Sequence, residues 1–99
     1  MVKIVWTDVS ILDLQEIFDY IAEDSVRYAS ITTLKIYQHV QRINNNPYLG
    51  RIVPEFNDIL IRELIEGNYR IIYRIKTELQ VDILRIYHSA RLLKRAFIK

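Results

Sequence analysis

Apolar residues in the first half of the chain recur at the spacing of an amphipathic helix. The first series is Ile11, Leu14, Ile17, Phe18 and Ile21. This spacing of three and four predicts a helix over residues near 8 to 24, with Thr7 or Asp8 as its N-cap. The second series is Val26, Ala29, Thr33, Ile36, Tyr37, Val40 and Ile43. Asp24-Ser25 separates the two series and Pro47 closes the second, so a hairpin of two helices is predicted.

The apolar period changes to two in the second half of the chain. Tyr69, Ile71, Tyr73 and Ile75 alternate there with Arg70, Ile72 and Arg74. Such alternation is typical of a half-buried strand. Further strands are predicted over residues 3–6, 60–65 and 80–87. Glu66-Gly67-Asn68 and Lys76-Thr77-Glu78 are short connections, which make the last three strands an antiparallel meander.

Together these elements predict one α+β domain over residues 1–99. It has an N-terminal strand, a two-helix hairpin packed on a twisted antiparallel sheet of about four strands, and a short basic C-terminal tail. Helices on one side of such a sheet leave its other face free for a partner. Aromatic side chains on the helix-facing side are expected to pack in the core, namely Trp6, Tyr69 and Tyr73.

Charge is unevenly distributed along the chain. The net charge is +2 over 99 residues, with acids frequent before Asp24 and bases dominating after Asp82. The basic end carries Arg85, Arg91, Lys94, Arg95 and Lys99. These cations suit an RNA, a DNA complex or an acidic protein segment, or they form a solvated tail. The first residues do not form a signal peptide and no stretch is long enough for a membrane span, so a cytoplasmic protein is expected.

Several kinds of chemistry are not supported by the sequence. His39 and His88 lie far apart and lack the paired spacing of metal ligands, so no metal is expected. Two glycines, Gly50 and Gly67, cannot form a phosphate-binding loop, and no nucleotide cofactor is expected. The chain has no cysteine, and no serine lies in the context of a catalytic nucleophile. The remaining candidate residues are basic and aromatic.

Several short segments, in their order and spacing, resemble those of one bacterial toxin superfamily. They are Trp6-Thr7; Asp13-Leu14 with Ile17 and Tyr20-Ile21; Pro47 with Gly50-Arg51; Arg62-Glu63-Leu64; Tyr69-Arg70-Ile71-Ile72-Tyr73; and Ile83-Leu84-Arg85-Ile86-Tyr87-His88 followed by Arg91. The chain is similar in these segments to the RelE/ParE toxins of type II toxin-antitoxin modules. The fold of that superfamily, a helical hairpin against a twisted antiparallel sheet, agrees with the periodicity.

The resemblance implies one of two activities. RelE-like members cut messenger RNA in the ribosomal A site, whereas ParE-like members poison DNA gyrase. In a ribonuclease, Arg70 would match a family arginine, Arg85 would add positive charge, and His88 would act as general acid or base. The C-terminal tyrosine of RelE-like nucleases has no counterpart, because Phe97 is the only aromatic residue after His88. The His-x-x-Arg ending, His88 to Arg91, favours ParE; the alternatives are a RelE-like nuclease and an inactive antitoxin-binding relative.

The resemblance also implies a cognate antitoxin, with which the chain forms a hetero-oligomer. Such antitoxins carry an acidic amphipathic segment, for which the helical hairpin offers a groove. The residues expected to bind target or antitoxin are Arg51, Arg62, Arg74, Arg91, Lys94 and Arg95. Pairing of Arg70 and Arg74 with Glu63, Glu66 or Asp82 across neighbouring strands is the structural alternative.

Overall fold

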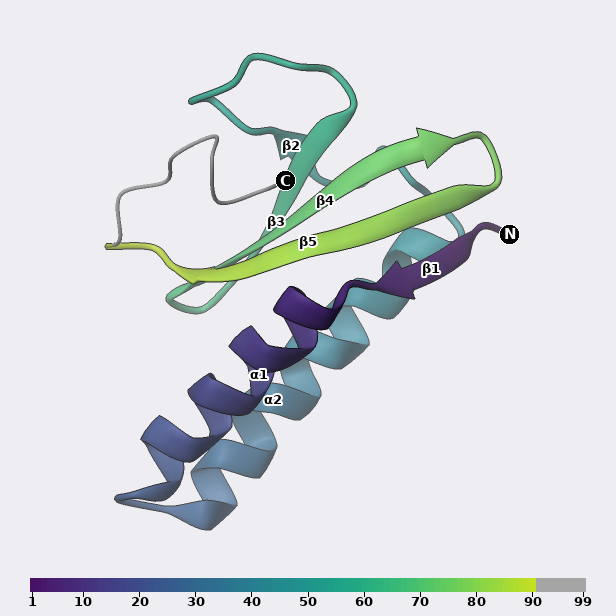
Figure 1. The fold of residues 1–99 in the computed structure, drawn as a ribbon. Helices are drawn as coiled ribbons and strands as arrows, with labels where there is room; N and C mark the ends of the chain where they lie inside the picture. Colours follow the sequence, from purple (N-terminus) through teal and green to yellow (C-terminus); the bar gives the residue numbers. More distant parts are fainter. Residues whose placement is uncertain (91–99) are drawn as a thin grey trace.

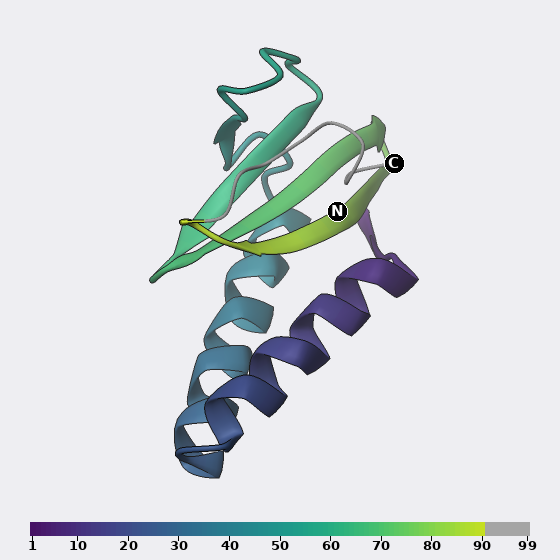
Figure 2. The same ribbon diagram turned by 60° about the vertical axis from the view of Figure 1, so that its left-hand side comes forward.

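The computed structural model describes residues 1–90, which fold into two layers (Figure 1). In chain order the elements are β1 (Lys3–Trp6), α1 (Asp8–Ala22), α2 (Val26–Gln41), the 3-10 turn η1 (Arg42–Asn44), β2 (Arg51–Ile52), β3 (Ile61–Glu66), β4 (Tyr69–Thr77) and β5 (Gln80–His88). The α1–α2 hairpin lies against one side of the sheet, and its loop points away from it (Figures 1 and 2). The predicted α+β architecture is confirmed. Neither α1 nor α2 has the length and apolar character needed to cross a bilayer.

Side-chain caps begin both helices. Thr7 Oγ1 accepts a hydrogen bond from the Ser10 amide at 3.2 Å, and Ser25 Oγ accepts one from the Tyr28 amide at 3.0 Å. Each cap satisfies one of the amides that the first turn leaves without a helical partner. Of the two expected caps, Thr7 is therefore the one used, and the break at Asp24-Ser25 is confirmed.

The sheet has five strands in the order β1-β5-β4-β3-β2. Strands β3, β4 and β5 form the predicted antiparallel meander. Two features differ from the sequence-based prediction. Strand β1 pairs with β5 in parallel, with Ile4 opposite Val81, and the two-residue strand β2 adds a fifth member beside β3. The first difference arises because the helical hairpin and strands β2 to β4 lie between β1 and β5 in the chain, so no tight turn dictates the relative direction of these two strands.

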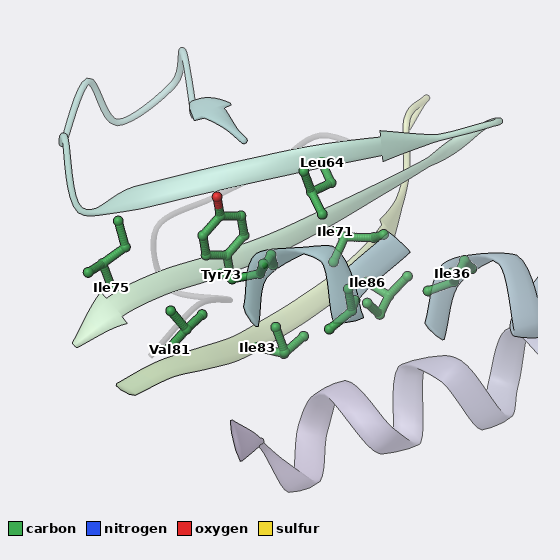
Figure 3. Packing of buried hydrophobic residues seen from close by; sticks show 10 residues of the cluster. Ile36, Leu64, Ile71, Tyr73, Ile75, Val81, Ile83 and Ile86 are labelled. Carbon is green, nitrogen blue, oxygen red and sulfur yellow. The ribbon is translucent and has the colours of Figure 1, made fainter. Parts of the chain in front are cut away.

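The main core lies between the sheet and the helices (Figure 3). Its buried residues include Ile36, Leu64, Ile71, Tyr73, Ile75, Val81, Ile83 and Ile86. Trp6 and Tyr69 pack against this cluster, and the Trp6 ring stacks on Tyr37 with centroids 6.3 Å apart. The predicted packing roles of Trp6, Tyr69 and Tyr73 are thus confirmed.

The opposite side of the sheet, here called the outer face, carries a second buried cluster. It consists of Val53, Ile61, Ile72, Leu84 and Tyr87, with Phe56 packed against it. Val53 and Phe56 belong to the connection between β2 and β3. The expectation that this face is free for a partner is therefore wrong over this area, because β4 alternates between two apolar environments rather than between core and solvent.

Candidate functional site

Arg70 lies on the outer face at the centre of a network of charges. Its Nε donates to Glu63 Oε1 at 2.6 Å, while Nη1 and Nη2 donate to the two carboxylate oxygens of Glu55 at 2.6 and 2.8 Å. Arg51 Nε donates to the other oxygen of Glu63 at 2.7 Å. The predicted pairing of Arg70 with Glu63 across neighbouring strands is confirmed, and Glu55 from the β2–β3 connection is an additional partner.

The network neutralises Arg70. The hydrogen bond with Glu55 raises the pKa of Arg70, and the same bond lowers the pKa of the Glu55 carboxyl. All three guanidinium nitrogens of Arg70 are engaged, and the residue is only 8% exposed. Two carboxylates thus occupy the donors with which this arginine would hold a phosphate.

Arg85 is also held by a carboxylate, on the edge of β5. Its Nε and Nη2 donate to the oxygens of Asp13 at 2.7 and 3.0 Å, which raises the pKa of Arg85. Asp13 accepts a third hydrogen bond from the Ile86 amide at 3.0 Å. Because β1 ends at Trp6, opposite Ile83, the edge of β5 away from β4 has no neighbouring strand at Arg85 and Ile86. The buried carboxylate of Asp13 accepts the hydrogen bond there that a strand would otherwise accept.

His88 lies at the end of β5, on the helix-facing side of the sheet. Its ring meets the edge of Tyr69 with centroids 5.6 Å apart, and its Nδ1 accepts a hydrogen bond from the Ala90 amide at 3.2 Å. The two rings border a hollow of about 300 Å³. Its other lining residues are Asp13, Glu16, Ile17, Tyr20 and Ile86. We call it the α1 hollow.

The sheet register separates the candidate nuclease residues. His88 is opposite Tyr69 and points with it towards the helices, whereas Arg70 is opposite Tyr87 and points to the outer face. Arg85 reaches the edge of the sheet and contacts Asp13. The three residues proposed for RNA cleavage are therefore not gathered around one position where a phosphate would react.

The remaining candidate arginines have different environments. Arg62 donates to the carbonyl oxygens of Ile59 and Gly50 at 3.0 and 2.9 Å, and its guanidinium lies 4.8 Å from the centroid of the Tyr48 ring. It therefore fixes the segments on both sides of β2. Arg74 forms no ion pair with any of residues 1–90 and remains a partly exposed cation. Arg91, Lys94 and Arg95 lie outside the described residues.

Glu55 is a site neighbour that sequence reasoning did not single out, and Asp13 was named only within a segment of the resemblance, without a role. Asp13 lies in the same buried stripe of α1 as Ser10 and Ile17, and a carboxylate in such a stripe is a signal for a buried cationic partner. Glu55 lies in an irregular connection, where no periodicity marks it. Within residues 1–90, no His, Asp or Glu side chains cluster as metal ligands would.

Comparison with known proteins identifies the family. The model of the family described as "ParE toxin of type II toxin-antitoxin system, parDE" matches residues 4–93. A solved structure from P. aeruginosa, titled "Chromosomal ParDE TA system", is similar with a TM-score of 0.73 at 24% identity. The match covers 89% of this chain and 96% of that one; at this identity it supports the fold alone. No curated protein matches the sequence. On the strength of the family match over residues 4–93, the chain belongs to the ParE toxins of type II toxin-antitoxin systems.

Proposed function

We propose that this ParE-family toxin inhibits DNA gyrase and does not cleave RNA. The observation that carries the proposal is the placement of Arg70 and His88 on opposite faces of the sheet. Gyrase inhibition is the activity typical of the family. The proposal places the toxin in the bacterial cytoplasm, where both gyrase and an antitoxin are found.

Cleavage of RNA through its 2′-hydroxyl requires an acid, a base and a cation around one phosphate. Here Arg70 is neutralised by Glu55 and Glu63, and Arg85 by Asp13. His88 has two tyrosines and two carboxylates around its hollow, and none of the arginines among residues 1–90 lines it. A negatively charged phosphate would be repelled there. This arrangement is unsuited to the catalytic role that the resemblance to RelE-like nucleases suggested for the three residues.

The test is gyrase supercoiling of a relaxed plasmid with increasing amounts of purified toxin. We expect dose-dependent loss of supercoiling and accumulation of double-strand breaks. Arg91→Ala, which removes the last residue of the His-x-x-Arg ending, is expected to relieve both effects. Arg27→Ala, an exposed arginine at the start of α2, is the matched control and should inhibit as the wild type does. Folded toxin without any effect on gyrase would contradict the proposal.

A further inference from the structure

The α1 hollow has the composition of a site for a positively charged side chain. Ile17 and Ile86 provide apolar surface, while Tyr20, Tyr69 and His88 provide aromatic rings. Tyr20 is 74% exposed, so its ring is open to a ligand. Aromatic faces attract ammonium and guanidinium groups within about 6 Å of the ring centroid.

The charge of the α1 hollow favours a cation as well. The carboxylate of Asp13 is offset by Arg85 and by the Ile86 amide. Glu16 is exposed and, within residues 1–90, makes no hydrogen bond or ion pair. Glu16 also attracts Arg85 at longer range, so Asp13 and Glu16 share one arginine and the hollow keeps an excess of one negative charge. Its volume of about 300 Å³ is enough for a single long side chain.

A path of opposite charge begins on the other side of Tyr69. Tyr69 also borders a hollow of about 210 Å³ formed with α2 and the β3–β4 turn. Lys35 and Glu66 line this second hollow and also a third, of about 350 Å³, to which Arg42 and His39 contribute. Lys35 and Arg42 outnumber the one carboxylate, Glu66, so this end is positive. We call the second and third hollows together the α2 groove.

The two ends reflect a segregation of charge between the helices. α1 contains Asp8, Asp13, Glu16 and Asp19 and neither lysine nor arginine, whereas α2 contains Arg27 and Lys35 and no acid. The hairpin continues beyond the β3–β4 turn, away from the sheet (Figures 1 and 2). A segment that crosses beneath this turn would pass from a negative to a positive surface.

We propose that the cognate antitoxin lays one segment across these hollows, with an arginine or lysine in the α1 hollow and acidic residues along the α2 groove. The inference requires a cognate antitoxin, which membership of a toxin-antitoxin family provides, and it does not depend on the proposed inhibition of gyrase. It refines the acidic segment expected from the resemblance, because a purely acidic segment would leave Glu16 facing like charge. A nucleic acid is a poorer occupant, since its phosphates would meet the excess negative charge of the α1 hollow.

The segment has a defined direction as a result. Reversing it would place the cationic side chain against Lys35 and Arg42 and the acids against Glu16, so both ends would be repulsive. Like charges in contact are an effective means of rejecting a wrong register or a wrong partner. The same device would discriminate this antitoxin from others whose charges run in the opposite order.

The test is the dissociation constant of the purified cognate antitoxin for toxin variants that remove one charge from each end. Glu16→Gln and Lys35→Gln are each expected to raise the dissociation constant about tenfold, and to weaken its dependence on salt. Asp19→Asn, an exposed acid of α1 bonded to Gln15, and Arg27→Gln are the matched controls. Both should bind within about twofold of the wild type. Circular dichroism and thermal unfolding verify that each variant is folded.

The outcomes separate this inference from the proposed function. Wild-type affinity in Glu16→Gln, with a loss in Lys35→Gln, would mean a purely acidic segment and would overturn the inference. Equal affinity in all variants, or antitoxin binding absent from the wild type, would also overturn it. Loss of gyrase inhibition in Glu16→Gln would assign the α1 hollow to the target instead. Failure of the wild-type toxin to inhibit gyrase, with the expected changes in antitoxin binding, would count only against the proposed function.

Discussion

The pair formed by Arg70 and Glu63 places two charges almost entirely out of water. Glu63 is 1% exposed and Arg70 8% exposed. Buried charges persist only where fixed partners replace their hydration. Arg51 and Glu55 supply those partners from β2 and from the β2–β3 connection. The network therefore ties an irregular connection to the sheet, and this structural role has to be separated from any role of Arg70 in function.

Replacing Arg70 by alanine should destabilise the fold strongly. The substitution leaves the buried Glu63 with Arg51 alone, a loss expected to cost about 3–5 kcal/mol in the free energy of unfolding. Urea denaturation measures the change. Arg74→Ala removes a partly exposed arginine of the same strand and should cost less than about 0.5 kcal/mol. Equal stability of the two variants would show that the network contributes little. Loss of toxicity in Arg70→Ala is thus uninformative without a folding measurement.

The pair of Arg70 with Glu55 should make the fold sensitive to acid. Because Arg70 lowers the pKa of Glu55 in the folded state, the unfolded chain binds more protons at this site. The stabilisation that this ion pair gives the fold is complete above the pKa of a glutamate in the unfolded chain, about 4.3. It is lost as the pH falls through the lower pKa of Glu55 in the folded state. Glu55→Gln should therefore be less stable at neutral pH and lose less stability on acidification. Urea midpoints across the pH range test this, with the exposed Glu78→Gln as control. Parallel profiles for wild type and Glu55→Gln would contradict it.

Gly50 is required by space rather than by backbone conformation. A Cβ at this position would lie 2.5 Å from the Glu63 carbonyl oxygen and 2.8 Å from the Tyr73 ring. The Gly50 amide donates to the Tyr73 hydroxyl at 2.8 Å, and that hydroxyl donates to the Pro47 carbonyl at 2.8 Å. Close packing around a buried hydroxyl leaves no room for a methyl group.

Gly50→Ala is accordingly expected to cost about 3 kcal/mol, the upper end of the range for overpacking. Gly67→Ala is the comparison, since nothing lies within 4 Å of its Cβ and only its φ of 57° is unfavourable. That strain is worth about 1–2 kcal/mol. Thermal or urea unfolding distinguishes the two sites, and a smaller loss at Gly50 than at Gly67 would refute the steric argument.

Helix α1 does more than cover the sheet, because Asp13 completes the edge of β5. The edge strand β1 ends at Trp6, and the chain turns into α1 through the Thr7 cap, whose hydroxyl donates to the Ile83 carbonyl at 2.7 Å. From there the exposed edge of β5 is satisfied by a side chain from α1. An uncovered edge is a site for unwanted strand pairing.

Asp13→Ala should loosen this edge locally. The amide of Ile86 loses its acceptor and Arg85 loses its carboxylate, so amide hydrogen exchange at Ile86 should become at least about tenfold faster, corresponding to about 1.4 kcal/mol. Exchange at Ile71, inside the sheet opposite Ile86, should change less. Asp19→Ala, on the exposed side of α1, should leave both amides unchanged. Unchanged exchange at Ile86 in Asp13→Ala would contradict the role assigned to Asp13.

The molecule as a whole uses the two faces of one sheet differently. The outer face is stabilised by a small apolar cluster and the Arg70 network, while the helix-facing side carries the main core and, at its end, the hollows along α1 and α2. A nuclease centre would need groups from both faces at one point. The five-stranded sheet lies between them.

Ribosome-bound messenger RNA should therefore remain intact at toxin concentrations that inhibit gyrase. His88→Ala should inhibit gyrase as strongly as the wild type, because the proposed activity makes no use of an imidazole acid or base. Primer extension on translated message detects cleavage, with a RelE-like nuclease as positive control. Cleavage that falls about a hundredfold in His88→Ala, the loss expected for a general acid or base, would reverse the assignment.

Much of the fold follows from local signals in the sequence. The two helices, the break at Asp24-Ser25, the meander and its turn at Gly67 all come from periodicity, capping and turn residues that act over a few positions. The pairing of Arg70 with Glu63 is also confirmed. It could be predicted because the two-residue turn at Gly67-Asn68 places these residues near each other on neighbouring strands. The parallel direction of β1 and the short strand β2 had no comparable signal.

The sequence by itself determined the helices, the meander, the aromatic residues of the core and the segments by which the chain resembles its family. Tertiary structure alone decided which charges are free. Asp13 reaches Arg85 across 72 positions of chain and Glu55 reaches Arg70 across 15, and no local pattern encodes such contacts. The side chains of Arg70 and His88 were likewise assigned to opposite faces only by the register of β4 with β5. The irregularities between Ile72 and Tyr73 and between Ile75 and Thr77 shift this register from the one that the short turn alone would give.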